Sequence, residues 1–204
     1  MDTKSLIQIP GYNYNEYLLI LNPPQVLQTK IIEVKKDFYE KYRADNALWG
    51  KPHLTLANFV QFEMMEERLV NRLKTIGMGY TPFKVELKDF GSFPSHTIFI
   101  NVDSKLQVKN LSRELRNAQK LMTLNKENKP HFFDDPHITI TRRLLPWQYE
   151  KGWQDYSHRH FTGRFIADGM LLIKRRVGTK AYQIVQRFEF MNLPVTTKQG
   201  DLFM

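Results

Sequence analysis

Two short segments of the chain repeat one arrangement of a histidine and a threonine. PHLTL (residues 52–56) and PHITI (residues 136–140) each place the threonine two residues after the histidine, with apolar residues at the alternate positions. Because successive side chains of a strand point to opposite faces, the histidine and threonine of each segment would share one face, with the apolar residues in the core behind them. A chain of this composition would contain about 0.07 such segments by chance.

Two histidines that face each other could perform general acid–base chemistry on a phosphodiester. A neutral imidazole takes a proton from the attacking hydroxyl or water, while an imidazolium gives a proton to the leaving oxygen on the opposite side of phosphorus. Threonine hydroxyls would hold the non-bridging oxygens. We therefore expect His53 and His137 to be catalytic and Thr55 and Thr139 to bind substrate, with no metal or other cofactor. For either motif alone, a hydrogen-bonded structural histidine is the simpler interpretation.

The elements that must position these motifs alternate between strands and helices. Apolar and alternating runs predict strands at residues 16–21, 53–60, 83–90, 96–102, 137–141, 163–176 (with a bulge at Gly169) and 181–190. Amphipathic spacing predicts helices at residues 26–42, 63–76, 104–121 (capped by Ser104) and 147–156. The second half repeats the element order of the first, which predicts two lobes related by a pseudo-two-fold, with equivalent residues facing each other across a groove.

Composition narrows the possible chemistry and location. The 204 residues suit one bilobal domain over residues 1–194, followed by a flexible tail at 195–204. The chain has no cysteine, which excludes disulfides, thiolate nucleophiles and Cys-ligated metals. We find neither a membrane-length apolar run nor a signal peptide, so the protein is expected to be cytoplasmic and free of membrane.

Positive charge is concentrated in the last third of the chain. The net charge is +9, and the block from Arg142 to Arg187 holds ten basic residues against three acidic ones. Together with its aromatic residues, this block could form a groove wall for a polyanion, although a solvated basic surface is the alternative. Arg175, in the Lys174–Arg176 run, is a candidate phosphate ligand, and Phe93 and Tyr182 are candidates for stacking a base.

Other patterns carry less information. The segment HFFDDPH (residues 131–137) could be a hard-metal cluster, but Asp-Asp-Pro is typical of a turn that enters a strand. A third His-x-Thr at residues 160–162 lacks the proline and the following apolar residue. The glycines at 77 and 79 lack the spacing and the Lys-Ser/Thr of a nucleotide-binding loop, which argues against an ATP-dependent kinase or ligase.

The two motifs, 84 residues apart, the segment FKVELKDFGSFPSHTIFINV (residues 83–102) and the order of elements resemble the two-histidine (2H) phosphoesterases. The resemblance is greatest to the 2',5'-RNA-ligase-like branch and covers residues 17–190. It implies an α+β fold with two mainly antiparallel sheets and outer helices around a central groove. It also implies action on 2',3'-cyclic or 2',5'-linked phosphates of RNA ends or nucleotides, without a metal, by a protein that we expect to be a monomer.

Carried over by position, the resemblance gives roles to individual residues. It implies that His53 and His137 are the acid–base pair, with Thr55 and Thr139 as phosphate ligands. Arg142 loosely fits the basic residue that often follows the second motif. The resemblance also places His96 and Phe93 near the groove as substrate-binding candidates. Two alternatives stay open: a non-catalytic RNA-binding module on the same fold, and a phosphodiesterase for a small cyclic-phosphate metabolite.

Overall fold

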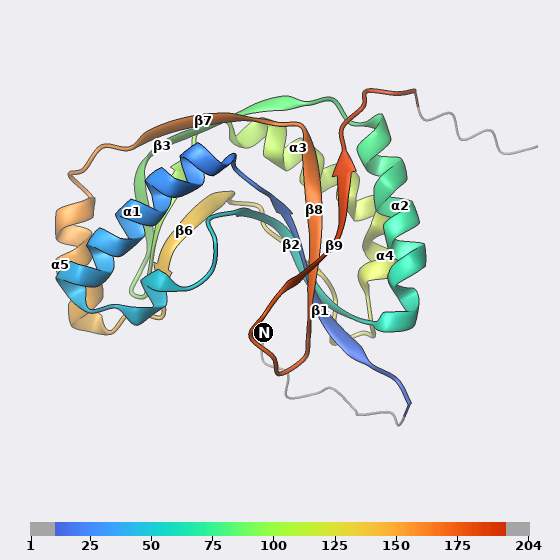
Figure 1. The fold of residues 1–204 in the computed structure, drawn as a ribbon, viewed down its shortest axis with the longest axis horizontal. Coiled ribbons are helices and arrows are strands. Elements are labelled where there is room, and N and C mark those ends of the chain that lie inside the picture. The colour runs from blue at the N-terminus through green and yellow to red at the C-terminus, as the bar shows by residue number, and fades with distance from the viewer. Residues whose placement is uncertain (1–10, 195–204) are drawn as a thin grey trace, which may run out of the picture.

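A computed structural model describes residues 11–194, which form one antiparallel sheet flanked by helices (Figure 1). The strands are β1 (Tyr14–Leu21), β2 (Leu54–Phe62), β3 (Phe83–Phe93), β4 (Thr97–Val102), β5 (His131–Phe132), β6 (His137–Arg142), β7 (Thr162–Ala167), β8 (Gly169–Arg176) and β9 (Gln183–Glu189). The helices are α1 (Gln25–Tyr42), α2 (Glu66–Gly79), α3 (Lys105–Leu115), α4 (Gln119–Met122) and α5 (Pro146–Tyr156), with short 3-10 turns η1 (Asp45–Leu48), η2 (Glu63–Met65) and η3 (Arg116–Ala118).

The sheet consists of two halves that meet at the two histidine strands. Its order is β7-β3-β4-β6-β2-β1-β8-β9, with β5 paired to β2. We call β2, β1, β8 and β9 the β2 half, and β6, β4, β3 and β7 the β6 half. A single residue pair, Leu54 with Ile138, joins β2 to β6. The two antiparallel sheets expected from the sequence are therefore present as two halves of one sheet.

The helices cover the sheet in two groups, which Figure 1 shows at opposite ends of the molecule. Although α1 follows β1 of the β2 half, it packs against β6 and β7 of the other half and against α5, which lies on β4. Conversely, α3 and α4 follow β4 but contact β2, and α2, which packs against both of them, lies on β9. Leu27, Ile31 and Phe38 form the buried stripe of α1, as their helical spacing predicts. Both halves contribute to one hydrophobic cluster.

Several predicted elements are confirmed and others need correction. The helices expected at 26–42, 63–76 and 147–156 are present to within a few residues, but the one expected at 104–121 is interrupted by η3. Ser104 does not cap α3 through its side chain, because its hydroxyl accepts a hydrogen bond from the Glu86 amide at 2.9 Å. The tail expected at 195–204 lies outside the described residues.

The strand expected at 163–176 is in fact two strands in different halves of the sheet. β7 pairs with β3 of the β6 half, and β8 pairs with β1 of the β2 half. The chain crosses from one half to the other at Asp168. A glycine is required next to this crossing, because a Cβ at Gly169 would lie 2.6 Å from the carbonyl oxygen of Phe188.

None of the helices within residues 11–194 combines the length and the apolar character that crossing a lipid bilayer would demand.

Candidate active site

The joint between β2 and β6 brings the two histidine motifs together. Leu54 and Ile138 are fully buried and directly opposite each other. Extending this antiparallel register by one residue in each direction places His53 opposite Thr139 and Thr55 opposite His137. All four side chains share the face opposite to the buried pair, because side chains alternate along a strand. The structure thus gathers the four residues that the sequence motif predicts.

Both imidazole rings are held in the same way. Nδ1 of His53 lies 2.8 Å from the carbonyl oxygen of Lys51, and Nδ1 of His137 lies 2.7 Å from that of Asp135. In each case the carbonyl belongs to the residue two positions before the histidine. A carbonyl oxygen only accepts hydrogen bonds, so Nδ1 carries the proton. Nε2 is therefore free to exchange a proton with a substrate.

A β-bulge follows the threonine of each motif. Along β1 the register shifts between the partners of Thr55 and Ala57, and along β4 it shifts between the partners of Thr139 and Thr141. The extra residue turns two successive side chains into the core and the next one to the histidine face. In the first half that next residue is Asn58 and in the second it is Arg142, so the two occupy equivalent positions.

His53 is surrounded by positive charge. Burial lowers its pKa, the hydrogen bond to the Lys51 carbonyl raises it, and the charges of Lys35 and Arg142 lower it further. Lys35 is only 5% exposed, and its Nζ donates to the carbonyl oxygens of Trp49 and Gly50, both at 2.8 Å. Burial and the neighbouring Arg142 charge lower the pKa of Lys35 to about 8. Lys35 thereby holds the loop that leads into His53.

His137 has different neighbours. Burial lowers its pKa, the hydrogen bond to the Asp135 carbonyl and the Asp135 charge raise it, and the charge of Lys105 lowers it. Its ring packs against Phe99 at 4.6 Å and edge-on against Phe93 at 5.1 Å between centroids. Phe93 therefore lies beside His137, where it supports a catalytic candidate through ring packing, and its predicted role in stacking a base stays a prediction.

Gly91 makes room for this arrangement. A Cβ at Gly91 would lie 2.5 Å from the Phe99 ring and 2.6 Å from Oδ1 of Asn101. Asn101 pairs with His137 across β4 and β6. Any side chain at position 91 would therefore displace two neighbours of the second histidine motif.

The two aspartates before His137 form ion pairs. Asp135 lies 2.7 Å from Nζ of Lys105, and Asp134 lies 3.2 Å from Nη2 of Arg116. Both basic residues come from the α3–η3 segment, so these contacts fix the loop that orients His137. Within residues 11–194, no group of three or more histidine, aspartate or glutamate side chains could hold a metal ion.

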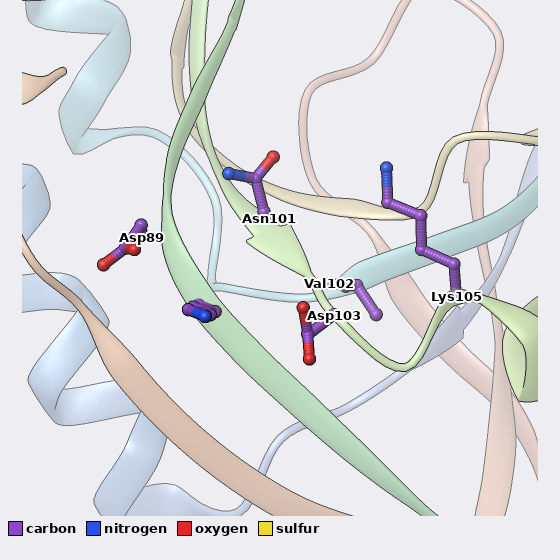
Figure 2. A pocket seen from close by; sticks show the side chains of 6 residues that line it. Asp89, Asn101, Val102, Asp103 and Lys105 are labelled. Atoms are coloured by element: carbon purple, nitrogen blue, oxygen red, sulfur yellow. The ribbon is translucent and has the colours of Figure 1, made fainter.

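An open pocket of about 290 Å³ borders the His137 side of the site (Figure 2). It is lined by Lys88, Asp89, Asn101, Val102, Asp103 and Lys105. Figure 2 shows the side chains of Asn101 and Lys105 projecting to the same side of β4, away from Asp103. The two lysines and two aspartates of this lining cancel in formal charge.

The remaining predicted substrate ligands differ in whether their side chains are free to contact a substrate. Arg142 faces the site, as described above. Arg175 forms an ion pair with Glu16, and its guanidinium lies 4.9 Å from the centre of the Tyr182 ring. His96 is exposed at the turn between β3 and β4, where its Nδ1 lies 2.6 Å from Oγ1 of Thr97. Because Thr97 pairs with Arg142, His96 is at the edge of the site rather than beside the two catalytic candidates.

The basic block does not form one uncompensated groove wall. Four of its ten cations are paired with carboxylates, namely Arg159, Lys174, Arg175 and Arg187. Lys174 and Arg175 are consecutive residues of β8 and so point to opposite faces of the sheet. The block that is continuous in sequence is therefore divided between surfaces in space.

Sequence reasoning did not identify Lys35, Asn58, Asn101 and Lys105 as parts of the site. Two of them, Asn58 and Lys35, lie at positions that a pattern in the sequence marks. Asn58 and Arg142 each follow their histidine by five residues, and Lys35 falls within the buried stripe, four residues after Ile31. Asn58 also has a buried Oδ1 that finds no hydrogen-bond partner among the described residues.

Comparisons with known proteins agree with this fold. The model of the 2'-5' RNA ligase superfamily matches residues 23–179. The E. coli LigT structure in its apo form is similar, with a TM-score of 0.61 and 16% sequence identity over 87% of this chain and 98% of that one. TT0787 of Thermus thermophilus gives a TM-score of 0.60 and 17% identity over 86% and 98% of the two chains.

At these identities the solved structures establish a common fold and nothing more. Among curated proteins, none matches the sequence. The family model spans well over half of the chain, and the fold it predicts is the one observed. The chain therefore belongs to the 2'-5' RNA ligase superfamily of two-histidine phosphoesterases.

Proposed function

We propose that this protein cleaves, or reversibly forms, 2',3'-cyclic or 2',5'-linked phosphodiesters of RNA ends or nucleotides, with His53 and His137 as the acid–base pair. The observation that carries the proposal is the identical presentation of the two rings. Each Nδ1 is bound to the carbonyl two residues earlier, and each ring lies across the β2–β6 joint from the threonine of the other motif. Membership of the superfamily supports the same chemistry.

In this mechanism the phosphate lies over the β2–β6 joint, between the two imidazoles. Nε2 of one histidine accepts the proton of the attacking hydroxyl or water, and Nε2 of the other donates a proton to the leaving oxygen. The hydroxyls of Thr55 and Thr139 donate hydrogen bonds to the non-bridging oxygens, where negative charge increases in the transition state. The Arg142 guanidinium, on the same face, stabilises that charge.

Two observations support a small nucleotide substrate. LigT, which has the same fold, has been crystallised in complex with 3'-AMP, a nucleoside monophosphate. In addition, part of the basic block of this chain is neutralised by carboxylates, which reduces its capacity to track a long RNA backbone. A phosphodiesterase for a small cyclic-phosphate compound is thus the second candidate. It predicts a shallow dependence of affinity on RNA length and on salt.

The proposal can be tested with a panel of phosphodiesters in the presence of EDTA. Adenosine 2',3'-cyclic phosphate and a 2',5'-linked diadenylate are the expected substrates, and a 3',5'-linked diadenylate is the comparison. His53→Ala and His137→Ala should each lower turnover by about 10²- to 10⁴-fold. His160→Ala is the matched control, because its ring is exposed and bonded to Asp89 at 3.2 Å. Full activity in either catalytic variant, or activity that returns only with added metal, would contradict the proposal.

A further inference from the structure

An exposed tryptophan lies in the loop that leads into the first histidine motif. Trp49 precedes His53 by four residues and is 61% exposed. Its backbone is fixed, because its carbonyl oxygen accepts a hydrogen bond from the buried Lys35 at 2.8 Å. The loop therefore presents a large apolar ring to solvent from an anchored main chain.

Residues of the loop between β8 and β9 stand near this ring. Nζ of Lys180 is 6.0 Å from the centre of the Trp49 ring, within the range of a cation–π contact. Tyr182, two residues further on, is 36% exposed and carries the Arg175 guanidinium over its ring. An exposed aromatic ring and a lysine from separate parts of the chain thus lie together, with Tyr182 two residues further along the loop that carries the lysine.

The charge of Arg142 connects the loop that carries Tyr182 to the catalytic candidates. Burial lowers the pKa of His53 and raises the pKa of Tyr182, and the positive charge of Arg142 acts on both groups to lower their pKa values. Unlike Arg175, neither Arg142 nor Lys180 pairs with a carboxylate within the described part of the chain. The surface around Trp49 and Lys180 therefore combines uncompensated positive charge with an exposed aromatic ring.

We propose that Trp49, with Lys180 beside it and Tyr182 beyond, forms a nucleobase-stacking subsite. This inference rests on the proposed function, since it assigns the base of the nucleoside whose phosphate lies between His53 and His137. Every base has a π face, and an aromatic ring next to a cation binds such faces with little dependence on sequence. The unpaired charges of Arg142 and Lys180 favour a nucleotide, which is anionic and aromatic, over an apolar protein partner.

The test compares substrates with and without a base. For adenosine 2',3'-cyclic phosphate, Trp49→Ala should raise KM about 5- to 150-fold, the range that loss of one base–aromatic stack would give. KM for a methyl riboside 2',3'-cyclic phosphate, which has no base, should not change. Trp49→Phe should keep most of the affinity. Trp147→Ala is the matched control, because Trp147 is likewise exposed but lies on α5.

Three outcomes would overturn the subsite: no change in KM with Trp49→Ala, an equal loss for both substrates, or loss of a dimer seen by sedimentation with nucleotide affinity unchanged. An equal loss would mean that Trp49 acts through the loop alone. Titration calorimetry with 3'-AMP distinguishes failure of the subsite from failure of the proposed function. If no phosphodiester is turned over but Trp49→Ala still weakens 3'-AMP binding, the subsite stands and the catalytic proposal fails.

Discussion

The β2 half and the β6 half present the same motif in different surroundings. In both halves a backbone carbonyl fixes Nδ1 of the histidine and a bulge follows the threonine. The charges that act on His53, those of Lys35 and Arg142, both oppose protonation. At His137 the Asp135 charge favours protonation and only Lys105 opposes it. One backbone arrangement can therefore supply two bases of unequal proton affinity.

The halves also differ in what supports the ring. His137 packs on Phe93 and Phe99, whereas the residue equivalent to Phe99 in the β2 half, the strand partner of Thr55, is Ile20. The β2 half instead relies on Lys35, which binds two carbonyls of the loop before His53. The His137 ring is thus oriented by ring packing, whereas the loop before His53 is held by the buried cation of Lys35.

The largest expected effect tests whether the two histidines act as a unit. His53→Ala and His137→Ala should each lower kcat by about 10²- to 10⁴-fold, the contribution of a positioned acid or base. The double variant should be little worse than either single one, because both groups act in the same step. Steady-state kinetics on all three variants makes the comparison. Losses that multiply in the double variant would show that the histidines act independently.

The next effect tests the difference between Arg142 and Asn58. Arg142→Gln should lower kcat/KM by about 10- to 150-fold, as expected for loss of a hydrogen bond to a charged group. Asn58→Ala, the change at the equivalent position, should cost less because no charge is removed. The Arg142 charge lowers the pKa of His53, so Arg142→Gln should raise it, and the limb of the kcat/KM profile that reports His53 should move to higher pH. Equal effects of the two variants would remove the proposed asymmetry.

Lys35→Met tests the support of the β2 half through stability. The pKa of Lys35 falls from 10.5 in the unfolded chain to about 8 in the folded one. Between these pH values the unfolded state binds more protons, so the free energy of unfolding should rise with pH, by at most about 3 kcal/mol. Tyrosines with raised pKa values lower the stability of both proteins alike as the pH rises, so urea titrations at pH 7.5 and pH 10 should show a more positive change in the wild type than in Lys35→Met. The same slope in both would place the titrating group elsewhere.

Gly91→Ala tests the support of the β6 half and should have the smallest effect. The added Cβ would displace the Phe99 ring or Asn101, at a cost of about 1–3 kcal/mol for overpacking. We expect a lower Tm and a several-fold loss of kcat, with the pKa of His53 unchanged in a histidine NMR titration. A change at His53 equal to that at His137 would show that the two halves are coupled rather than separately supported.

Much of this site could be predicted from the sequence because its signals are local. The two His-x-Thr-x segments fix residue types at a spacing of two, and strand geometry then puts each pair on one face. The helices on either side follow from the periodicity of their apolar residues. Each of these features is determined by residues within one short stretch of the chain.

The features that sequence reasoning missed depend on contacts between distant segments. The division of residues 163–176 into two strands depends on their separate partners, β3 and β1. The charge of Arg175 is neutralised by Glu16, 159 residues earlier. Lys35 resembles any helical lysine until the loop at Trp49 and Gly50 closes over it. No local pattern encodes these pairings.

The crossing of α1 and α3 between the halves has a consequence for how the site is kept rigid. Only one residue pair joins β2 to β6, so the backbone ladder alone is a weak hinge between the histidines. Because part of each half is covered by a helix that follows a strand of the other, an isolated half would leave part of its apolar face exposed. We expect a single cooperative unfolding transition, with amides of both halves exchanging through global opening. The spacing of the two histidines is then maintained for as long as the protein stays folded.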